Sequence, residues 1–193
     1  MTLKYLISPE KRRGKLKKIL ESKRIARGIE THNAISALIA NDLKVEVIKN
    51  NICCVNEFDF FWESSLTDSA SKGYPDIEVI SFDSRVKTIS EILEVTNKPM
   101  IVDGDTGGDI HHFEYLIPKL ERLGVSAIII EDKVFPKRNS LDADSSQEQE
   151  DPDRFADKIK AGKLSQLSED FMIIARIESL IAQTLVLRHL HSF

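Results

Sequence analysis

The chain has 193 residues, of which 41% are hydrophobic, and a formal net charge of -4 at pH 7. This length fits one globular unit, and the acidic balance argues against nucleic acid as a partner. No stretch approaches the roughly eighteen apolar residues of a membrane span, and the N-terminus lacks the apolar core of a secretory signal. We therefore predict a cytoplasmic protein that binds neither nucleic acid nor a membrane.

The first element is a basic stretch from Pro9 to Arg27. Leu16, Ile19 and Leu20 stand near helical spacing, which predicts an amphipathic helix with a cationic polar face. Such charge usually marks a solvated surface, so we assign no site to it. The sequence is accordingly divided into an N-terminal basic helical segment (1–27) and a main domain (28–193).

From residue 28 onward, predicted strands alternate with predicted helices. The stretch 45–56 is weakly patterned and is either an extra strand or a looped insertion; it holds the only cysteines, Cys53 and Cys54, which we interpret as reduced thiols. The stretch 133–152 is a long polar connection, typical of an active-site lid or a disordered insertion. Predicted strands cover about 28–33, 58–62, 99–102, 125–130 and 171–175, and predicted helices cover about 34–41, 84–96, 111–124 and 153–161.

This alternation predicts a parallel sheet, either an open doubly wound sheet or a barrel. Charged or polar side chains follow at least four successive strands, as in a barrel that builds one site from many loops. An open sheet would usually carry a phosphate-binding loop after its first strand, and the sequence has none there. We predict an α/β fold of the (β/α) barrel type.

Two carboxylates, Asp103 and Asp105, follow the strand 99–102 and lead into a glycine-rich turn, 104–108. Alternate residues of an extended backbone can point to the same side, and glycines let a ligand approach closely. Turn chemistry alone also explains an Asp-x-Asp pattern. The carboxylates suit Mg²⁺, which is held by one or two of them together with waters and leaves positions for an anionic substrate.

Four motifs together resemble the phosphoenolpyruvate mutase family, within the isocitrate lyase superfamily. They are Trp-Glu-Ser-Ser-Leu (62–66), Asp-Gly-Asp-Thr-Gly (103–107), Glu-Asp-Lys-Val-Phe-Pro-Lys-Arg-Asn-Ser-Leu (131–141) and Ile-Ala-Arg-Ile-Glu (174–178). The resemblance implies a (β/α)8 barrel that assembles into homodimers or homotetramers. It also implies interconversion of phosphoenolpyruvate and phosphonopyruvate, the isomerase step that forms a carbon-phosphorus bond in phosphonate biosynthesis.

The same resemblance implies roles for single residues. By this resemblance, Asp103 would be the direct Mg²⁺ ligand, and Asp105 and Glu131 would act on the ion mostly through bound waters. Arg176 would face the phosphoryl group. Asp76 would be the catalytic aspartate, either as nucleophile or as electrostatic guide.

Further residues of the resemblance hold or enclose the substrate. Lys137 and Asn139 belong to a gating loop that closes over the phosphoryl group and excludes water. The residues implied to bind substrate are Trp62, Ser64, Ser65, Leu66 and Ser140.

Alternatives remain open within and outside the superfamily. Isocitrate and methylisocitrate lyases carry a cysteine acid on the loop that corresponds to 133–139, which has none here. Phosphonopyruvate hydrolase has a threonine where this chain has Asn139, which favours the mutase. An inactive relative that acts only in assembly is a third interpretation, because 183–193 departs from the family pattern. We expect a barrel truncated after about five strands.

Overall fold

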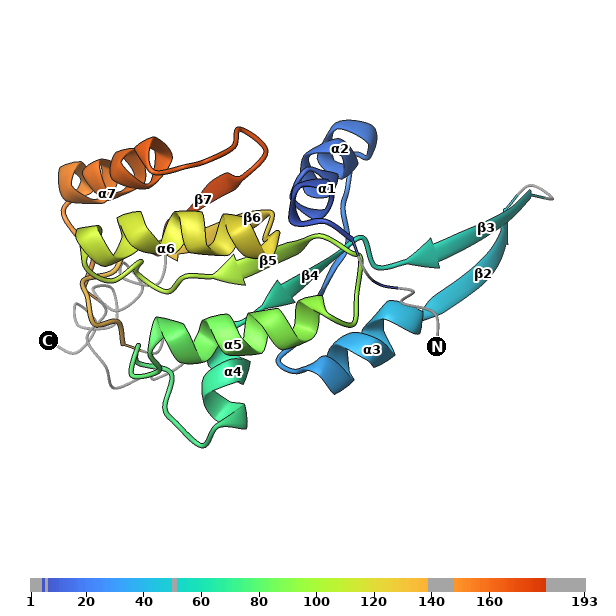
Figure 1. Ribbon diagram of the computed structural model, residues 1–193, viewed down its shortest axis with the longest axis horizontal. Helices are drawn as coiled ribbons and strands as arrows, with labels where there is room; N and C mark the ends of the chain where they lie inside the picture. The colour runs from blue at the N-terminus through green and yellow to red at the C-terminus, as the bar shows by residue number, and fades with distance from the viewer. Residues whose placement is uncertain (1–4, 6, 50–51, 139–147, 180–193) are drawn as a thin grey trace, which may run out of the picture.

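The computed structural model describes residues 5, 7–49, 52–138 and 148–179 (Figure 1). These residues form a five-stranded parallel sheet, in the order β1-β4-β5-β6-β7, and a separate two-stranded sheet. Each parallel strand pairs with the next one along the chain, so the described sheet has none of the reversal that marks a doubly wound fold. The five strands predicted from sequence are confirmed as β1 (Gly28–Glu30), β4 (Phe60–Glu63), β5 (Met100–Asp103), β6 (Ala127–Glu131) and β7 (Met172–Arg176).

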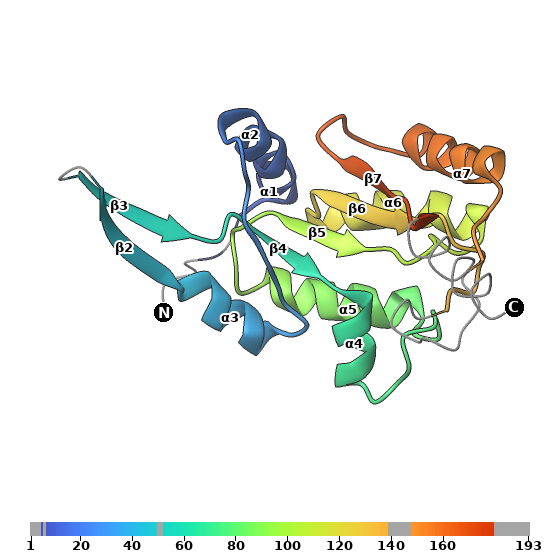
Figure 2. The ribbon, with the colours of Figure 1, turned by 180° about the vertical axis from the view of Figure 1, so that it is seen from behind.

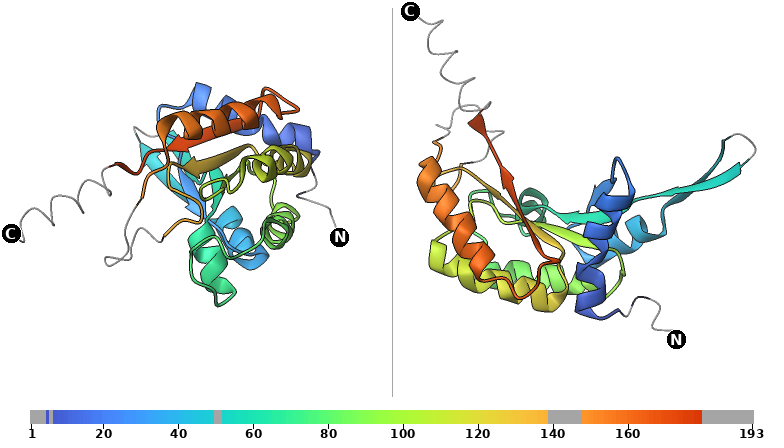
Figure 3. Two further views of the ribbon diagram at one scale, coloured as in Figure 1. Left: turned by 90° about the vertical axis from the view of Figure 1, so that its left-hand side faces the viewer. Right: turned by 90° about the horizontal axis from the view of Figure 1, so that it is seen from above.

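Four helices cover one face of this sheet, and Figure 3 shows three of them, α5, α6 and α7, side by side along it. Gly124 follows α6 in the left-handed conformation, at φ 88°, which agrees with the end of the helix predicted over 111–124. The helices are α3 (Ala34–Asp42), α5 (Phe82–Leu93), α6 (Ile110–Leu123) and α7 (Pro152–Leu164).

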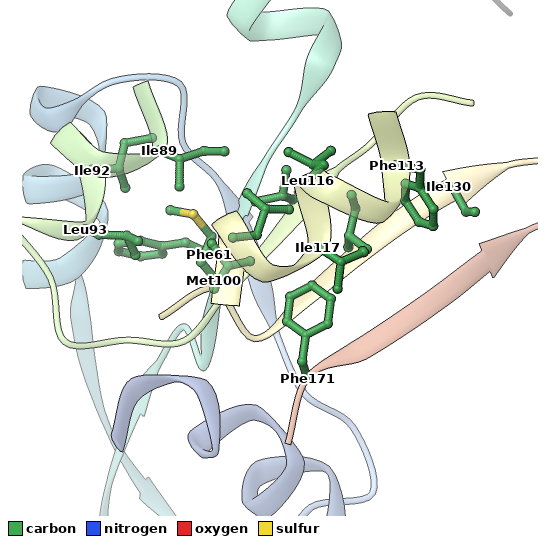
Figure 4. Packing of buried hydrophobic residues seen from close by; sticks show 14 of the residues in the cluster. Phe61, Ile89, Ile92, Leu93, Met100, Phe113, Leu116, Ile117, Ile130 and Phe171 are labelled. Atoms are coloured by element: carbon green, nitrogen blue, oxygen red, sulfur yellow. The ribbon is translucent and has the colours of Figure 1, made fainter. Parts of the chain in front are cut away.

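The main core lies between these helices and the sheet (Figure 4). Phe61 of β4, Met100 of β5 and Ile117 of α6 are fully buried there. Each such side chain contributes roughly 1.5–3 kcal/mol by leaving water. On the opposite face, Ile101 and Ala127 pack against Leu16. The central strands are therefore buried on both faces, as expected for parallel sheet.

The basic N-terminal stretch differs from the prediction in two ways. It forms two short helices, α1 (Pro9–Arg13) and α2 (Lys15–Ser22), instead of one long helix to Arg27. Its cationic face is not wholly solvated, because Arg12 and Arg13 are buried.

The buried guanidinium groups bind backbone carbonyls at the ends of two other helices. Arg12 donates to the carbonyls of Leu93 at 2.8 Å and Thr96 at 3.0 Å, and Arg13 donates to that of Glu121 at 2.6 Å. The last carbonyls of a helix have no intrahelical partner and carry partial negative charge. The sequence pattern could not show that α5 and α6 end beside these arginines.

The weakly patterned stretch 45–56 is an antiparallel hairpin of β2 (Lys44–Lys49) and β3 (Ile52–Glu57). Figures 1 and 2 show it projecting away from the body of the molecule. Cys53 and Cys54 are free thiols exposed on β3. The extra-strand alternative is the one that the structure adopts.

A further helix, α4 (Ser65–Ser71), lies in a stretch for which the sequence predicted neither a helix nor a strand. Asp68 is buried in it and accepts from Lys72, one turn later, at 2.7 Å. Over the described ranges, the helices are all too short or too polar to cross a membrane.

Candidate active site

The turn after β5 places two carboxylates at the carboxyl edge of the sheet. The amide of Asp105 donates to Oδ1 of Asp103 at 3.0 Å, and the carbonyl of Asp105 accepts from the amide of Glu131 at 2.8 Å. Asp105 has φ 55°, a left-handed conformation that is uncommon for residues other than glycine. Gly104 is required for close approach, because a Cβ there would lie 2.7 Å from Ile128.

The Lys137 ammonium gathers residues from the segments that follow β4, β5 and β6. Its Nζ lies 2.6 Å from Oδ1 of Asp105 and 3.0 Å from Oδ2 of Asp76, and it donates to Oγ of Ser65 at 3.1 Å. The Ser65 hydroxyl in turn donates to Oδ2 of Asp103 at 3.1 Å. Five residues predicted as separate parts of a site therefore lie within one connected network.

Charge is retained in this network despite burial. Burial alone would raise the pKa of Asp105, but Arg85 and then Lys137 hold it below its usual value. Burial would lower the pKa of Lys137, and the neighbouring Asp105 carboxylate raises it instead. Both groups are consequently ionised at neutral pH.

Arg176, the last residue of β7, reaches the other side of the carboxylate turn. Its guanidinium lies 3.7 Å from Oδ2 of Asp103, contacts Oε2 of Glu131 and lies 2.8 Å from Oε1 of Glu178. Its side chain is 32% exposed, whereas that of Glu131 is 1% exposed. The guanidinium thus lies between the buried carboxylates and solvent, where an anionic ligand can reach it.

The carboxylates fit Mg²⁺ better than they fit a metal held by many protein ligands. Among the residues that the structure describes, no group of three or more His, Cys, Asp or Glu side chains is arranged to hold a metal ion. Mg²⁺ does not need such a cage, because it keeps several waters and uses one or two carboxylates. Oε1 of Glu131 is buried and accepts no hydrogen bond from the described residues, so it is available to such an ion or its waters.

Glu78 is a residue of the site that the sequence analysis missed. It accepts from the amide and hydroxyl of Thr106, at 3.0 and 2.7 Å, and from the amide of Lys137 at 2.8 Å. Burial, and then Asp105, raise its pKa. Glu78 thus links the turn after β5 to the loop after β6. The only signal for it in the sequence was its position two residues after Asp76.

Arg85 and Glu63 were missed as well. Arg85, on α5, donates to Oδ2 of Asp105 at 3.0 Å and to Oε2 of Glu63 at 2.7 Å, and both Arg85 and Glu63 are buried. Burial raises the pKa of Glu63 to about 7, although Arg85 opposes the shift. A signal existed, because Arg85 precedes Ile89 and Ile92 at helical spacing on the apolar stripe of its helix.

A cavity of about 330 Å³ lies beneath the loop after β6. Lys133, Lys137 and Arg138 line it, together with Phe135 and one carboxylate, Glu148. Lys137 therefore contacts the carboxylate network and also lines a hollow in which three cationic side chains outnumber one carboxylate.

Comparison with known proteins identifies the family. The family model for phosphoenolpyruvate phosphomutase matches residues 16–189. The chain belongs to the phosphoenolpyruvate phosphomutase family. Phosphoenolpyruvate phosphomutase of Tetrahymena pyriformis is 34% identical over 182 residues, covering 94% of this chain and 56% of that protein. The chain thus spans about half the length of the curated relatives it matches.

Solved structures of the family have the same fold. The phosphoenolpyruvate phosphomutase of Streptomyces platensis subsp. rosaceus superposes with a TM-score of 0.76 at 31% identity, covering 87% of this chain and 54% of that one. A phosphonopyruvate hydrolase in complex with oxalate and Mg²⁺ superposes with a TM-score of 0.74 at 30% identity, covering 95% and 59%. The fold is that of the barrel proteins of this superfamily, of which the described residues supply five parallel strands.

The other residues that the family resemblance singled out lie outside the hydrogen-bonded network around Lys137 or outside the described residues. Ser64 is buried where α4 begins, and its carbonyl accepts from the amide of Asp68 at 3.0 Å. Trp62 and Leu66 are 37% and 39% exposed, and their side chains take no part in the hydrogen bonds that link the described site. Asn139 and Ser140 lie outside the described residues.

Proposed function

We propose that the chain carries a phosphoenolpyruvate mutase site, which interconverts phosphoenolpyruvate and phosphonopyruvate with Mg²⁺. The observation that supports this most directly is the position of Lys137, whose ammonium contacts both Asp76 and Asp105. Sequence resemblance assigned Asp76 to the reaction, Lys137 to the gating loop and Asp105 to the metal, and all three meet at one point.

Such an arrangement suits phosphoryl transfer. A loose phosphoryl group needs positioning and neutralisation of charge more than covalent help. Mg²⁺ held by Asp103, with Asp105 and Glu131 acting through waters, would neutralise the carboxylate and enolate oxygens of the substrate. Lys137 and Arg176 supply positive charge for the phosphoryl oxygens from opposite sides of the carboxylate turn.

The loop after β6 supplies the enclosure that the reaction requires. Water reaching the phosphoryl group would convert a mutase into a hydrolase, so the site must be closed during transfer. Lys137 is 4% exposed, and its backbone amide donates a hydrogen bond to the Glu78 carboxylate. We assign Asn139 to the same closure as Lys137, and Trp62, Ser64, Ser65, Leu66 and Ser140 to substrate binding.

Phosphonopyruvate hydrolase is the second candidate. The specific observation in its favour is the 30% sequence identity to a phosphonopyruvate hydrolase solved with oxalate and Mg²⁺. The identity to the mutase structure is nearly equal, at 31%. Both enzymes cleave the same carbon-phosphorus bond, and they differ in whether the phosphoryl group goes to the enolate oxygen or to water.

Phosphorus NMR of the purified chain with phosphonopyruvate and Mg²⁺ tests the proposal. Formation of phosphoenolpyruvate supports the mutase, and formation of inorganic phosphate supports the hydrolase. A folded sample that changes neither signal contradicts both and favours a relative that acts only in assembly.

Two substitutions sharpen the test. D76A should abolish whichever conversion occurs, and retained turnover would refute the role of Asp76. D83N is the matched control, because Asp83 is an 84% exposed carboxylate on α5 that pairs with the surface Lys119. It should leave turnover unchanged.

Assembly and location belong to the same proposal. We propose homodimers or homotetramers, as the resemblance implies, and a cytoplasmic location, as the sequence composition suggested. Light scattering during size-exclusion chromatography measures the mass of the assembly, and a monomer at micromolar concentration would contradict it.

A further inference from the structure

Arg85 contacts the Asp105 carboxylate at Oδ2, the oxygen that Lys137 does not contact. It lies on the buried face of α5 and is 3% exposed. One terminal nitrogen donates to Oδ2 of Asp105 at 3.0 Å, and the other donates to Oε2 of Glu63 at 2.7 Å. A planar guanidinium that binds two carboxylates in this way has its orientation fixed.

Asp105 is a residue whose orientation needs such support. Its backbone is left-handed, and its two carboxylate oxygens have different partners, Arg85 on Oδ2 and Lys137 on Oδ1. Lys137 belongs to a loop that the mechanism requires to move. Arg85 belongs to a twelve-residue helix packed into the core. When Lys137 turns to a substrate, Arg85 is therefore the partner that still holds Asp105.

We propose that Arg85 is a positioning residue that orients Asp105 toward the metal, with Glu63 as the counter-charge that fixes Arg85. This inference rests on the proposed function, because it takes Asp105 to be part of the Mg²⁺ site. Neither Arg85 nor Glu63 touches the substrate. They act through Asp105, as outer partners of metal ligands do.

Metal affinity distinguishes this role from a purely structural ion pair. Mn²⁺ serves as the probe, and its binding is followed by electron paramagnetic resonance. D83N is the control, because Asp83 is an exposed carboxylate on the same helix as Arg85, and this variant should bind Mn²⁺ within about threefold of the unsubstituted chain. The double variant E63Q/R85M removes both buried charges together and should bind about 10- to 100-fold more weakly.

Both variants are also examined by circular dichroism and thermal unfolding. Unchanged Mn²⁺ affinity in a folded E63Q/R85M variant overturns the inference. If the double variant does not fold, R85K takes its place, since lysine keeps the charge but cannot bridge two carboxylates. Weaker Mn²⁺ binding by R85K supports the inference, and unchanged binding overturns it.

A second readout does not depend on metal. The amide of Asp105 donates to Asp103 within the turn, so its hydrogen exchange reports how well the turn is held. Loss of Arg85 should speed exchange at Asp105 and leave Ile101 and Val102 in β5 unaffected. If the unsubstituted chain binds no Mn²⁺, the metal assignment in the proposed function fails, and this exchange measurement alone decides whether Arg85 positions Asp105.

Discussion

Glu63 makes the stability of the fold depend on pH in a direction opposite to that of most carboxylates. It is fully buried at the end of β4, and burial raises its pKa to about 7 from the usual 4.5. In the unfolded chain the same carboxyl loses its proton near its usual value. Between these two values, the folded chain binds one more proton than the unfolded chain.

The sign and size of the effect follow from this difference. Because the folded state binds more protons, the free energy of unfolding falls as pH rises from about 4.5 to about 7. One pKa unit corresponds to about 1.36 kcal/mol, so the contribution lost over this window is about 3 kcal/mol. E63Q removes the titrating group and should remove this slope.

Urea unfolding of the unsubstituted chain and of E63Q, at pH values from about 4.5 to 8, measures the difference in free energy of unfolding between the two. Histidines and other carboxylates titrate in both proteins and cancel in this difference. The free energy of the unsubstituted chain should fall relative to that of E63Q by about 3 kcal/mol across the range. A difference that stays constant with pH would refute the argument, since it would mean that Glu63 has the same pKa folded and unfolded.

Two further predictions concern the loop after β6. K137Q should raise the affinity for Mn²⁺ roughly 20-fold, because the ammonium beside Asp105 repels a divalent ion by about 1.7 kcal/mol at about 5 Å in water. Titration calorimetry measures this affinity, and unchanged or weaker binding would contradict the prediction. E78Q should destabilise the fold by about 1–2 kcal/mol in urea unfolding, because the amide nitrogen of the new side chain would face either the donors of Thr106 or the amide of Lys137. A change as small as that of D83N would count against the bridging role of Glu78.

Sequence reasoning predicted which candidate site residues end a strand or directly follow one. Asp103, Glu131 and Arg176 end β5, β6 and β7, so the strand pattern alone fixed which edge of the sheet they share. The parallel order then brings consecutive strand ends together. Apolar runs reveal strands, and for this reason the five strands and the site edge were predictable.

The remaining parts depend on contacts between segments far apart in the chain. Glu78 lies in a loop whose path has no periodicity to read, and its three hydrogen bonds reach Thr106 and Lys137, 28 and 59 residues away. Arg12 was assigned to a solvated helix face because charge at helical spacing usually means that. It is buried because helix ends elsewhere offer carbonyls to it.

The described network has a consequence for how metal and substrate bind. Charges alternate along its contacts, from Glu63 through Arg85, Asp105 and Lys137 to Asp76. In this arrangement the Lys137 ammonium neutralises the charge of the Asp105 carboxylate. A bound divalent ion would neutralise that charge instead. The ion and the ammonium repel each other, so ion binding favours movement of Lys137 away from Asp105. An anionic phosphoryl group is the partner that can receive it, and the adjoining cavity is where such a group fits. Metal and substrate should therefore each raise the affinity of the chain for the other. The K137Q variant should lose this coupling, even though it binds the metal alone more tightly than the unsubstituted chain does.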